Sequence, residues 1–360
     1  MAAVPDPGWW RGRRVFLTGH TGFVGGWLAS WLLHLGARVS GYALEPPESP
    51  AFFVRTALAR RLSSHILGDL GDAPGLTAAL RESEPQVVMH LAAQALVRDA
   101  WREPALTFAT NVQGTVNVLE AARHCPSVER IVVYTTDKVY RNDQSGRPFR
   151  EDDPLGGNEP YSASKAGADW AARAYWESYL RGPGRVALAV VRAGNIVGGG
   201  DHARDRLLPD AVRAFGSGEE LAVRSPDSTR PWQHVLDAVR GTLLLAERTQ
   251  PGAAPSGGIA WNFGPAEGAV HRVAEVADLA ARAWGKGARW RHVPDGSIAE
   301  AKALVLSSER ARRELGWHCA WGLERAVEAS IAWYFAARDP AVDMQAYTVE
   351  QIAAHEREAA

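Results

Sequence analysis

Tyr161 and Lys165 have the i, i+4 spacing that places two side chains on one face of a helix. A free phenol has a pKa near ~10, and a nearby ammonium group or the positive end of a helix favours the phenolate. Thr136 follows a strand-like segment, and its hydroxyl could hydrogen-bond to the same substrate oxygen. A tyrosine and a lysine that share a helix by chance are the alternative. The added threonine favours a site for hydride-transfer chemistry on an alcohol.

Two ionisable residues, Asp137 and Lys138, follow Thr136 directly. An oxidation alone does not need them. An acid and a base beside a redox site suggest an elimination that is coupled to the redox step. The alternative is that Asp137 caps a turn and Lys138 points to water. Because Thr136, Tyr161 and Lys165 already predict redox chemistry, we favour the elimination.

A glycine-rich segment lies between a predicted strand at 15–18 and an amphipathic helix. Its glycines let the backbone turn tightly and approach a pyrophosphate, and the helix N-terminus offers free N–H groups to the phosphates. A tight turn without a ligand is the less favoured alternative. The predicted dinucleotide contacts here are Gly19, His20, Thr21, Gly22, Phe23, Val24 and Gly25.

Other cofactor contacts are expected where later strands end. Asp69 could contact adenine or simply cap a turn. Ala43 stands where an acidic residue usually holds the ribose hydroxyls, with Glu45 two positions later. No arginine follows at once, so a 2′-phosphate is not indicated and NAD is preferred to NADP. The further predicted contacts are Asp69, Leu70, Leu91, Ala92, Ala93, Tyr161 and Lys165.

The second half of the chain holds groups suited to a nucleotide diphosphate. Asn195 could bind a phosphate or sugar oxygen, and Arg206 and Arg230 could clamp a diphosphate. Each alone is more often a solvated charge or a salt-bridge partner, but together they favour a nucleotide-sugar substrate. The predicted substrate contacts are Gln94, Asn195, Arg206, Arg230 and His234.

Alternating strands and helices must position the candidate site residues. Apolar runs that are rich in β-branched residues alternate with amphipathic stretches up to about residue 194, which predicts a doubly wound parallel Rossmann-type sheet of the α/β class. Strands are expected at 15–18, 38–42, 65–69, 86–92, 130–135 and 186–192, and helices at 22–35, 74–82, 104–124 and 160–180.

A smaller mixed α/β lobe is expected to follow this sheet. The predicted units are a cofactor-binding domain at 12–194, a nucleotide-sugar lobe at 195–340 and a C-terminal tail at 341–360, which is helical or frayed. The lobe is expected to contain helices at 208–215, 235–248, 273–284 and 323–337 and strands at 221–224 and 259–263.

Composition excludes several classes of protein. Lys and Arg number 40 against 41 Asp and Glu in 360 residues, and this balance argues against a nucleic-acid partner. Cys125 and Cys319 are far apart and outside any CxxC pattern, so neither a disulfide framework nor a metal cluster is expected. Long apolar runs and a signal-like N-terminus are lacking, which predicts a cytoplasmic protein without a membrane partner.

From Val15 to about Tyr334 the chain resembles the extended short-chain dehydrogenase/reductases, and among them the 4,6-dehydratases that act on CDP-glucose. The matching stretches are GHTGFVGGWL, GYAL, HLAAQALVR, NVQGTVNVLEA, TTDKVY, EPYSASKAGAD, VRAGNIVGGGD, DRLLPD, RPWQHVLD, WNFGP and LGWHCAWGLERA. Most sugar dehydratases of this fold carry Thr-Asp-Glu after the fifth strand. The CDP-glucose branch has lysine at the third place, as here at Lys138.

The resemblance implies a mechanism and an assembly. Tyr161, with Thr136 and Lys165, would deprotonate the C4 hydroxyl while its hydride passes to NAD. Lys138 would remove the C5 proton and Asp137 would protonate the departing C6 hydroxyl, and the hydride would return to C6 to give a 4-keto-6-deoxy sugar. A homodimer built from the helices at 104–124 and 160–180 is also implied.

Three residues depart from the pattern of that family. It commonly has lysine where this chain has Val24, tryptophan where it has His202, and aspartate where it has Ser307. A 4-epimerase or dehydrogenase of the same fold, or a dehydratase for another nucleotide hexose, is the alternative. Epimerases usually carry small residues at the places of Asp137 and Lys138. A non-catalytic nucleotide-sensing member of the fold would typically lose the tyrosine or the lysine, and both are present here.

Overall fold

The computed structural model describes residues 2–46, 51–182, 186–252, 257–266, 268–294 and 303–360. A seven-stranded parallel sheet forms its centre, with the strand order β3-β2-β1-β4-β5-β6-β11. The strands are β1 Arg14–Thr18, β2 Arg38–Ala43, β3 Ser64–Leu67, β4 Val87–His90, β5 Arg130–Tyr134, β6 Ala187–Ala193 and β11 Ala260–Phe263. This order confirms the doubly wound sheet. The order reverses between β1 and β4, where ligands bind in folds of this kind.

Helices cover both faces of the sheet, because its strands are apolar on both sides. In β1, Val15 and Leu17 pack with one set of helices, and Phe16 between them packs with the other. The first set is α2 Phe23–His34, α10 Val235–Arg248 and α14 Met344–Ala359. The second is α4 Ala73–Ser83, α7 Gly114–Arg123 and α8 Pro160–Tyr175.

The helix expected at 104–124 is divided. It consists of α6 Pro104–Phe108, a π-helical turn at Ala109–Gln113 and α7, and a short helix, α5 Val97–Arg102, precedes it. The helix expected at 160–180 likewise ends in a π-helical turn, Trp176–Leu180. Short segments outside the sheet were not expected from the sequence: α1 Pro7–Trp10, α3 Phe52–Arg55, 3₁₀ turns at Leu58–Arg61 and Asp137–Val139, and α12 Glu309–Leu315.

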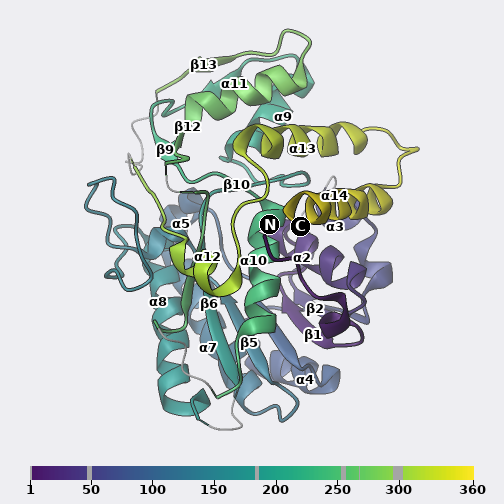
Figure 1. Cartoon of the computed structure of the whole chain (residues 1–360), viewed down its shortest axis with the longest axis vertical. Coiled ribbons are helices and arrows are strands. Elements are labelled where there is room, and N and C mark those ends of the chain that lie inside the picture. Colours follow the sequence, from purple (N-terminus) through teal and green to yellow (C-terminus); the bar gives the residue numbers. More distant parts are fainter. Residues whose placement is uncertain (1, 47–50, 183–185, 253–256, 267, 295–302) are drawn as a thin grey trace.

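A smaller lobe with its own apolar core stands at one end of the sheet (Figure 1). Three helices form most of it: α9 Leu207–Ser217, α11 Val273–Trp284 and α13 Leu323–Ala336. Two strands, β8 Leu221–Val223 and β13 Trp290–His292, pair in parallel beside them. Two further short pairs join β7 Ile196–Val197 to β10 Gln233–His234 and β9 Thr229–Arg230 to β12 His271–Arg272.

The two predicted units are interleaved in the sheet. β1 to β6 lie within 12–194, but β11 and the covering helix α10 come from the segment predicted as the substrate lobe. The C-terminal segment also packs firmly, because Ile352 and His355 of α14 are fully buried. In the described part of the chain, no helix is long and apolar enough to span a membrane.

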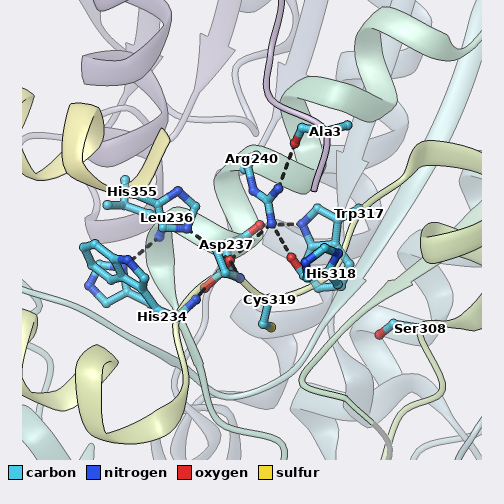
Figure 2. A network of polar contacts seen from close by, with 12 residues as sticks. Ala3, His234, Leu236, Asp237, Arg240, Ser308, Trp317, His318, Cys319 and His355 are labelled. Atoms are coloured by element: carbon cyan, nitrogen blue, oxygen red, sulfur yellow. Dashed lines mark hydrogen bonds and ion pairs between the residues drawn. The ribbon is translucent and has the colours of Figure 1, made fainter. Parts of the chain in front are cut away.

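A buried ion-pair network joins both chain ends to α10 (Figure 2). The carboxylate of Asp237 accepts hydrogen bonds from His355 Nε2 at 3.0 Å and from the Ala320 N–H at 2.7 Å, and it pairs with Arg240 at 3.4 Å. Arg240 also donates to the Ala3 carbonyl at 2.7 Å. The network therefore fixes the N-terminal segment and α14 beside the sheet.

Candidate active site

One large cavity of about 1520 Å³ opens at the carboxyl ends of the central strands. It runs from the glycine-rich loop after β1, past Tyr161, to the side formed by α9 and β8 of the lobe. It is the place at which a doubly wound sheet binds its ligands. The predicted residues that line it are Gly19, Thr21, Gly22, Phe23, Val24, Gly25, Asp69, Leu70, Leu91, Ala92, Ala93, Gln94, Thr136, Asp137, Lys138, Tyr161, Lys165, Asn195, Arg206 and Arg230.

The glycine loop has the shape that a dinucleotide needs. Gly19 has φ +79°, and a Cβ there would lie 2.7 Å from the Ala92 nitrogen. A Cβ on Gly25 would lie 2.1 Å from the Gly19 oxygen. Gly22 begins α2 without any side-chain cap, so the first N–H groups of the helix face the cavity without a competing oxygen. The residues present therefore fit a pyrophosphate.

His20 does not reach the cavity with its side chain. The imidazole is fully buried, and its Nε2 lies 2.7 Å from Nδ1 of His65. Burial, with the nearby His65, lowers the pKa of His20 to about 4. The ring therefore does not line the cavity, and the predicted contact of His20 with the cofactor stays a prediction. The ring instead fills space beside β2, where a Cβ on Gly41 would meet it at 2.5 Å.

Both interpretations of Asp69 agree with the structure. Its Oδ1 accepts a hydrogen bond from the Gly71 N–H at 2.6 Å, which caps the turn after β3. The residue also lines the cavity next to Leu70, as do Ala43 and Leu44 at the end of β2. Thr21 joins this region to the glycine loop by donating to the Leu44 carbonyl at 3.0 Å.

The start of α8 positions Tyr161 and Lys165. Glu159 caps the helix, because its carboxylate accepts hydrogen bonds from the N–H groups of Tyr161 and Ser162, both at 2.7 Å. One turn later Lys165 Nζ donates to the Tyr134 carbonyl at the end of β5, at 3.1 Å. The cap and this bond hold both side chains against the end of β5, which Thr136 follows.

Burial is the main cause of the pKa shifts of Tyr161 and Lys165. It raises the pKa of Tyr161 to about 12, while a hydrogen bond with Thr136 and the charge of Arg206 lower it. Burial also lowers the pKa of Lys165 to about 8. We expected the ammonium of Lys165 to favour the phenolate. In the structure Thr136 and Arg206 are the groups that favour it.

Asp137 and Lys138 lie directly beside this pair. Asp137 is 1% exposed, and its Oδ1 accepts a hydrogen bond from the Thr136 hydroxyl at 3.0 Å. Its Oδ2 is buried without a hydrogen-bond partner among the described residues. Lys138 Nζ lies 3.7 Å from Oδ1 of Asp137. Thr136, not Asp137, caps the 3₁₀ turn, so the capping alternative for Asp137 is wrong.

Four of the five side chains predicted to contact the substrate line the cavity. Asn195 and Arg206 face the cavity: Asn195 Oδ1 is buried without a partner among the described residues, and Arg206 binds Asp201 at 2.9 Å. Arg230, on β9, lines the same wall. Gln94 lines the cavity too, although its amide oxygen accepts from the Leu96 N–H at 2.5 Å.

His234 lies outside the cavity, so its prediction as a substrate contact is wrong. It is fully buried and caps α10, with Nδ1 accepting from the Leu236 N–H at 3.2 Å. Its ring packs against Trp27 and Trp321 behind the cavity wall. Burial lowers the pKa of His234 to about 3. A capping histidine and a ligand-binding one have the same appearance in the sequence.

Asn111 is a positioning residue that was not predicted. It lies in the π-helical turn, fully buried, with Oδ1 accepting from the Gln94 N–H at 2.8 Å and Nδ2 donating to Ser164 Oγ of α8 at 2.9 Å. It therefore joins the loop after β4 to the helix of Tyr161. Other cavity residues that the sequence did not indicate are Arg98, Trp101, Asp201, Arg204, Asp205, Arg224 and Trp232.

The three departures from the family pattern lie in different surroundings. Val24 lines the cavity in the first turn of α2. His202 packs edge-on against Tyr334, with ring centroids 5.7 Å apart. Ser307 is buried and donates its N–H to the Phe149 carbonyl at 2.9 Å. Of the three, only Val24 therefore lines the cavity. Within the described residues, no three His, Cys, Asp or Glu side chains gather as a metal site requires.

Known proteins resemble this chain over most of its length. It is 41% identical over 334 residues to a CDP-glucose 4,6-dehydratase from Salmonella typhimurium, covering 91% of this chain and 92% of that protein. It is 32% identical over 271 residues to a dTDP-glucose 4,6-dehydratase from Streptomyces griseus, covering 74% and 76% of the two chains.

Solved structures share the fold. A UDP-glucose 4-epimerase from Thermotoga maritima, crystallised with UDP-glucose, superposes with a TM-score of 0.78 at 20% identity, over 90% of this chain and 99% of that one. A dTDP-glucose 4,6-dehydratase from Bacillus anthracis, solved with NAD, gives 0.76 at 22% identity, over 90% and 97%. The family model described as the NAD dependent epimerase/dehydratase family matches residues 15–264. With this match and these identities, the chain belongs to the NAD dependent epimerase/dehydratase family.

Proposed function

We propose that this enzyme is a nucleotide-sugar 4,6-dehydratase that converts CDP-glucose to CDP-4-keto-6-deoxyglucose. One observation carries the proposal: a buried carboxylate, Asp137, and an amine, Lys138, lie beside Tyr161 and Thr136 in one cavity. Oxidation or epimerisation at C4 needs no second acid and base, whereas the removal of water from C5 and C6 needs both. The 41% identity to a CDP-glucose 4,6-dehydratase supports the same conclusion.

The cofactor end of the cavity fits NAD. The glycine loop and the start of α2 would hold its diphosphate, and Asp69 and Leu70 would line the adenosine part. When bound, NAD supplies the redox chemistry by accepting a hydride from C4 of the hexose and returning one to C6. Residues 12–194 would supply most of this site, and residues 195–340 most of the nucleotide-sugar site.

Tyr161 is the base for the C4 hydroxyl in this proposal. Loss of the hydroxyl proton to Tyr161, together with loss of the C4 hydride to the oxidised nicotinamide, would leave a ketone at C4, which makes the neighbouring C5 proton acidic. The buried Lys165 lies within one helical turn of Tyr161 and holds the backbone of β5. Thr136 lowers the pKa of Tyr161 and can orient the same substrate oxygen.

The elimination requires one proton to leave C5 and one to reach the C6 hydroxyl. Lys138 would remove the C5 proton, and Asp137 would protonate the C6 hydroxyl, which leaves as water. The 3.7 Å between Lys138 Nζ and Asp137 Oδ1 places both groups on one side of the site. As the hydride returns to C6, Lys138 would return a proton to C5, which gives the 4-keto-6-deoxy sugar. Tyr161 has then gained the proton that Asp137 lost, so the number of protons on the enzyme is unchanged.

The proposal includes a cytoplasmic homodimer. α8 packs beside α5, α6 and the π-helical turn, and large apolar side chains remain exposed on these helices. Phe108 is 42%, Trp170 54% and Tyr179 52% exposed. A second copy of the same helices would cover them in a four-helix bundle. Sedimentation as a monomer at micromolar concentration would contradict the dimer.

Mass spectrometry of the reaction tests the function. The purified protein is incubated, with and without added NAD, with CDP-glucose and with dTDP-, UDP- and GDP-hexoses. Loss of one water from the CDP sugar is the expected result. An unchanged mass with a shifted retention time would indicate an epimerase instead. No reaction with any sugar would refute the proposal.

A further inference from the structure

On the side of the cavity formed by the lobe lies a carboxylate paired with two arginines, which the reaction steps above do not use. Asp205 lies in the loop before α9 and lines the cavity. Its Oδ1 pairs with Arg224 of the segment after β8, at 2.5 Å, and with Arg98 of α5, at 3.4 Å. Arg224 and Arg98 also line the cavity. Three separate segments therefore converge on one carboxylate.

The backbone at Asp205 is held in an unusual conformation. Its φ is +63°, in the left-handed region, which aspartate and asparagine adopt more readily than other residues apart from glycine. Such positions persist where the surrounding structure fixes them, and they gather at ligand sites. Both ion pairs are made to Oδ1, and no described residue hydrogen-bonds to Oδ2. The side chain is 38% exposed, so Oδ2 is accessible to a ligand.

The orientation of the bound nucleotide sugar places its nucleobase near Asp205. The hexose must lie at Tyr161, and the charge of Arg206 acts on Tyr161, so a diphosphate bound by Arg206 lies next to the sugar. The nucleoside then extends away from the glycine loop, toward α9 and β8. Apolar side chains suited to the faces of a flat ring line this part of the cavity, among them Leu207, Leu221 and Val223.

We propose that Asp205, paired with Arg224, selects a cytosine base over uracil or thymine. The inference rests on the proposed function. Cytosine presents an amino group at C4, a hydrogen-bond donor, where uracil and thymine present a carbonyl oxygen. A carboxylate accepts from the amino group but repels the carbonyl oxygen. The guanidinium of Arg224 donates to N3 and O2 of cytosine, both acceptors, whereas N3 of uracil carries a proton.

Asp205 is favoured over Asp210, another carboxylate in this part of the cavity. Asp210 is in the first turn of α9 and is bound by Arg213 of the same helix, one turn away. The guanidinium of Arg213 also donates to the carbonyls of His202 and Ala203, both at 3.1 Å, so it is held against the loop before α9. Asp205 instead faces a guanidinium that comes from a separate segment and that can contact the same base edge.

The Asp205→Asn variant tests this directly. Asparagine is tolerated in the left-handed region like aspartate, so the loop can keep its conformation. Its amide can present N–H groups to a carbonyl oxygen. We expect the ratio of kcat/KM for CDP-glucose to kcat/KM for UDP- or dTDP-glucose to fall by on the order of 10- to 100-fold. Turnover of CDP-glucose at saturation should change by only a few-fold.

Two further variants complete the test. Asp210→Asn makes the same change in charge within the same cavity and should leave the ratio as in the wild type. Arg224→Lys removes the planar donor fork but keeps the charge, and it should also lower the ratio. It provides the readout if Asp205→Asn does not fold, which its thermal unfolding midpoint would reveal.

The outcomes are distinguishable. Two results would overturn the role of Asp205 but leave the dehydratase intact. One is an unchanged ratio of kcat/KM for CDP-glucose to kcat/KM for UDP- or dTDP-glucose in folded Asp205→Asn. The other is a wild-type enzyme that uses the CDP, UDP and dTDP sugars equally well. A wild-type enzyme that converts none of these sugars overturns the proposed function, and this inference with it.

Discussion

The hydroxyl of Thr136 donates a hydrogen bond to Oδ1 of Asp137 across 3.0 Å, and it also lowers the pKa of the Tyr161 phenol. One side chain thus joins the base proposed for the oxidation to the acid proposed for the elimination. We expect Thr136→Val to lower kcat by on the order of 100-fold or more, because both proton transfers lose an orienting group.

The neighbouring Thr135 provides a matched control for that experiment. It is also buried, but its hydroxyl donates to the Val191 carbonyl at 3.0 Å, away from the phenol. Thr135→Val should cost about 1 kcal/mol of stability and keep kcat within a few-fold. Equal losses of kcat in the two variants would show that Thr136 acts only through packing.

Lys138→Met should separate the oxidation from the elimination. Without the amine, the C5 proton has no base, so dehydration should slow by roughly 10²- to 10⁴-fold. In D₂O, NMR of recovered sugar should show no deuterium at C5, whereas the wild-type product carries it. Deuterium at C5 appearing at the wild-type rate would exclude Lys138 as the base.

Gly19→Ala should disrupt the cofactor loop. The new Cβ would lie 2.7 Å from the Ala92 nitrogen at φ +79°, so the loop after β1 and the loop after β4 must move apart. NAD affinity, measured by calorimetry, should fall at least tenfold. Gly12→Ala is the control, since Gly12 has φ +77° with nothing within 4 Å of its Cβ. It should cost only the backbone strain, about 1–2 kcal/mol, with NAD affinity unchanged.

Acid should destabilise the fold through buried neutral histidines. Burial lowers the pKa of His90 from 6.5 to about 3. Between pH 6.5 and pH 3 the unfolded chain therefore binds a proton at His90 that the folded protein does not. Stability is therefore retained above pH 6.5 and is lost as the pH falls toward 3, by about 1.4 kcal/mol per pH unit for this residue.

Urea unfolding at pH 7 and pH 5 measures this effect. His90→Gln should be less stable at pH 7, because His90 hydrogen-bonds to Thr18 and Thr115 at 2.8 and 3.0 Å. Between the two pH values, however, the variant should lose about 2 kcal/mol less than the wild type. The same pH dependence in both proteins would disprove the assignment.

Asp237→Asn should strongly destabilise the protein. Arg240 and His355 are both fully buried, and Arg240 would lose its counter-ion. Breaking such a pair costs about 3–5 kcal/mol. Glu358→Gln is the control, because its pair with Arg325 at 3.0 Å is solvent-exposed and should contribute less than about 1 kcal/mol. Similar unfolding midpoints for the two variants would contradict this view of the network.

Much of the cofactor end follows from local sequence. The glycine loop, the Tyr161–Lys165 spacing and the strands of the sheet are set by short-range patterns, and the structure confirms their placement. The predicted strand at 86–92 is shorter in the structure, Val87–His90, because Leu91 and Ala92 leave the sheet to line the cavity. Apolar residues suit both positions, so their pattern cannot give the end of the strand.

Long-range contacts account for what the sequence did not reveal. Asn111 makes hydrogen bonds to Gln94 and Ser164, which are 17 and 53 positions away. His234 is removed from the cavity by the tryptophans that surround it, from α2 and from the loop before α13. Asp205 acquires its partners from α5 and from the segment after β8. No local periodicity carries this information.

The last strand of the sheet has a consequence for the growing polypeptide. β11 pairs with β6, yet residues 194–259 must be synthesised between the two. At ~5–20 residues per second a ribosome needs roughly 3 to 13 s for that stretch. During this interval the nascent chain carries an open strand edge at β6, a surface on which sheets from other chains can add. Until β11 is made and pairs with β6, that edge is available to chaperones as well.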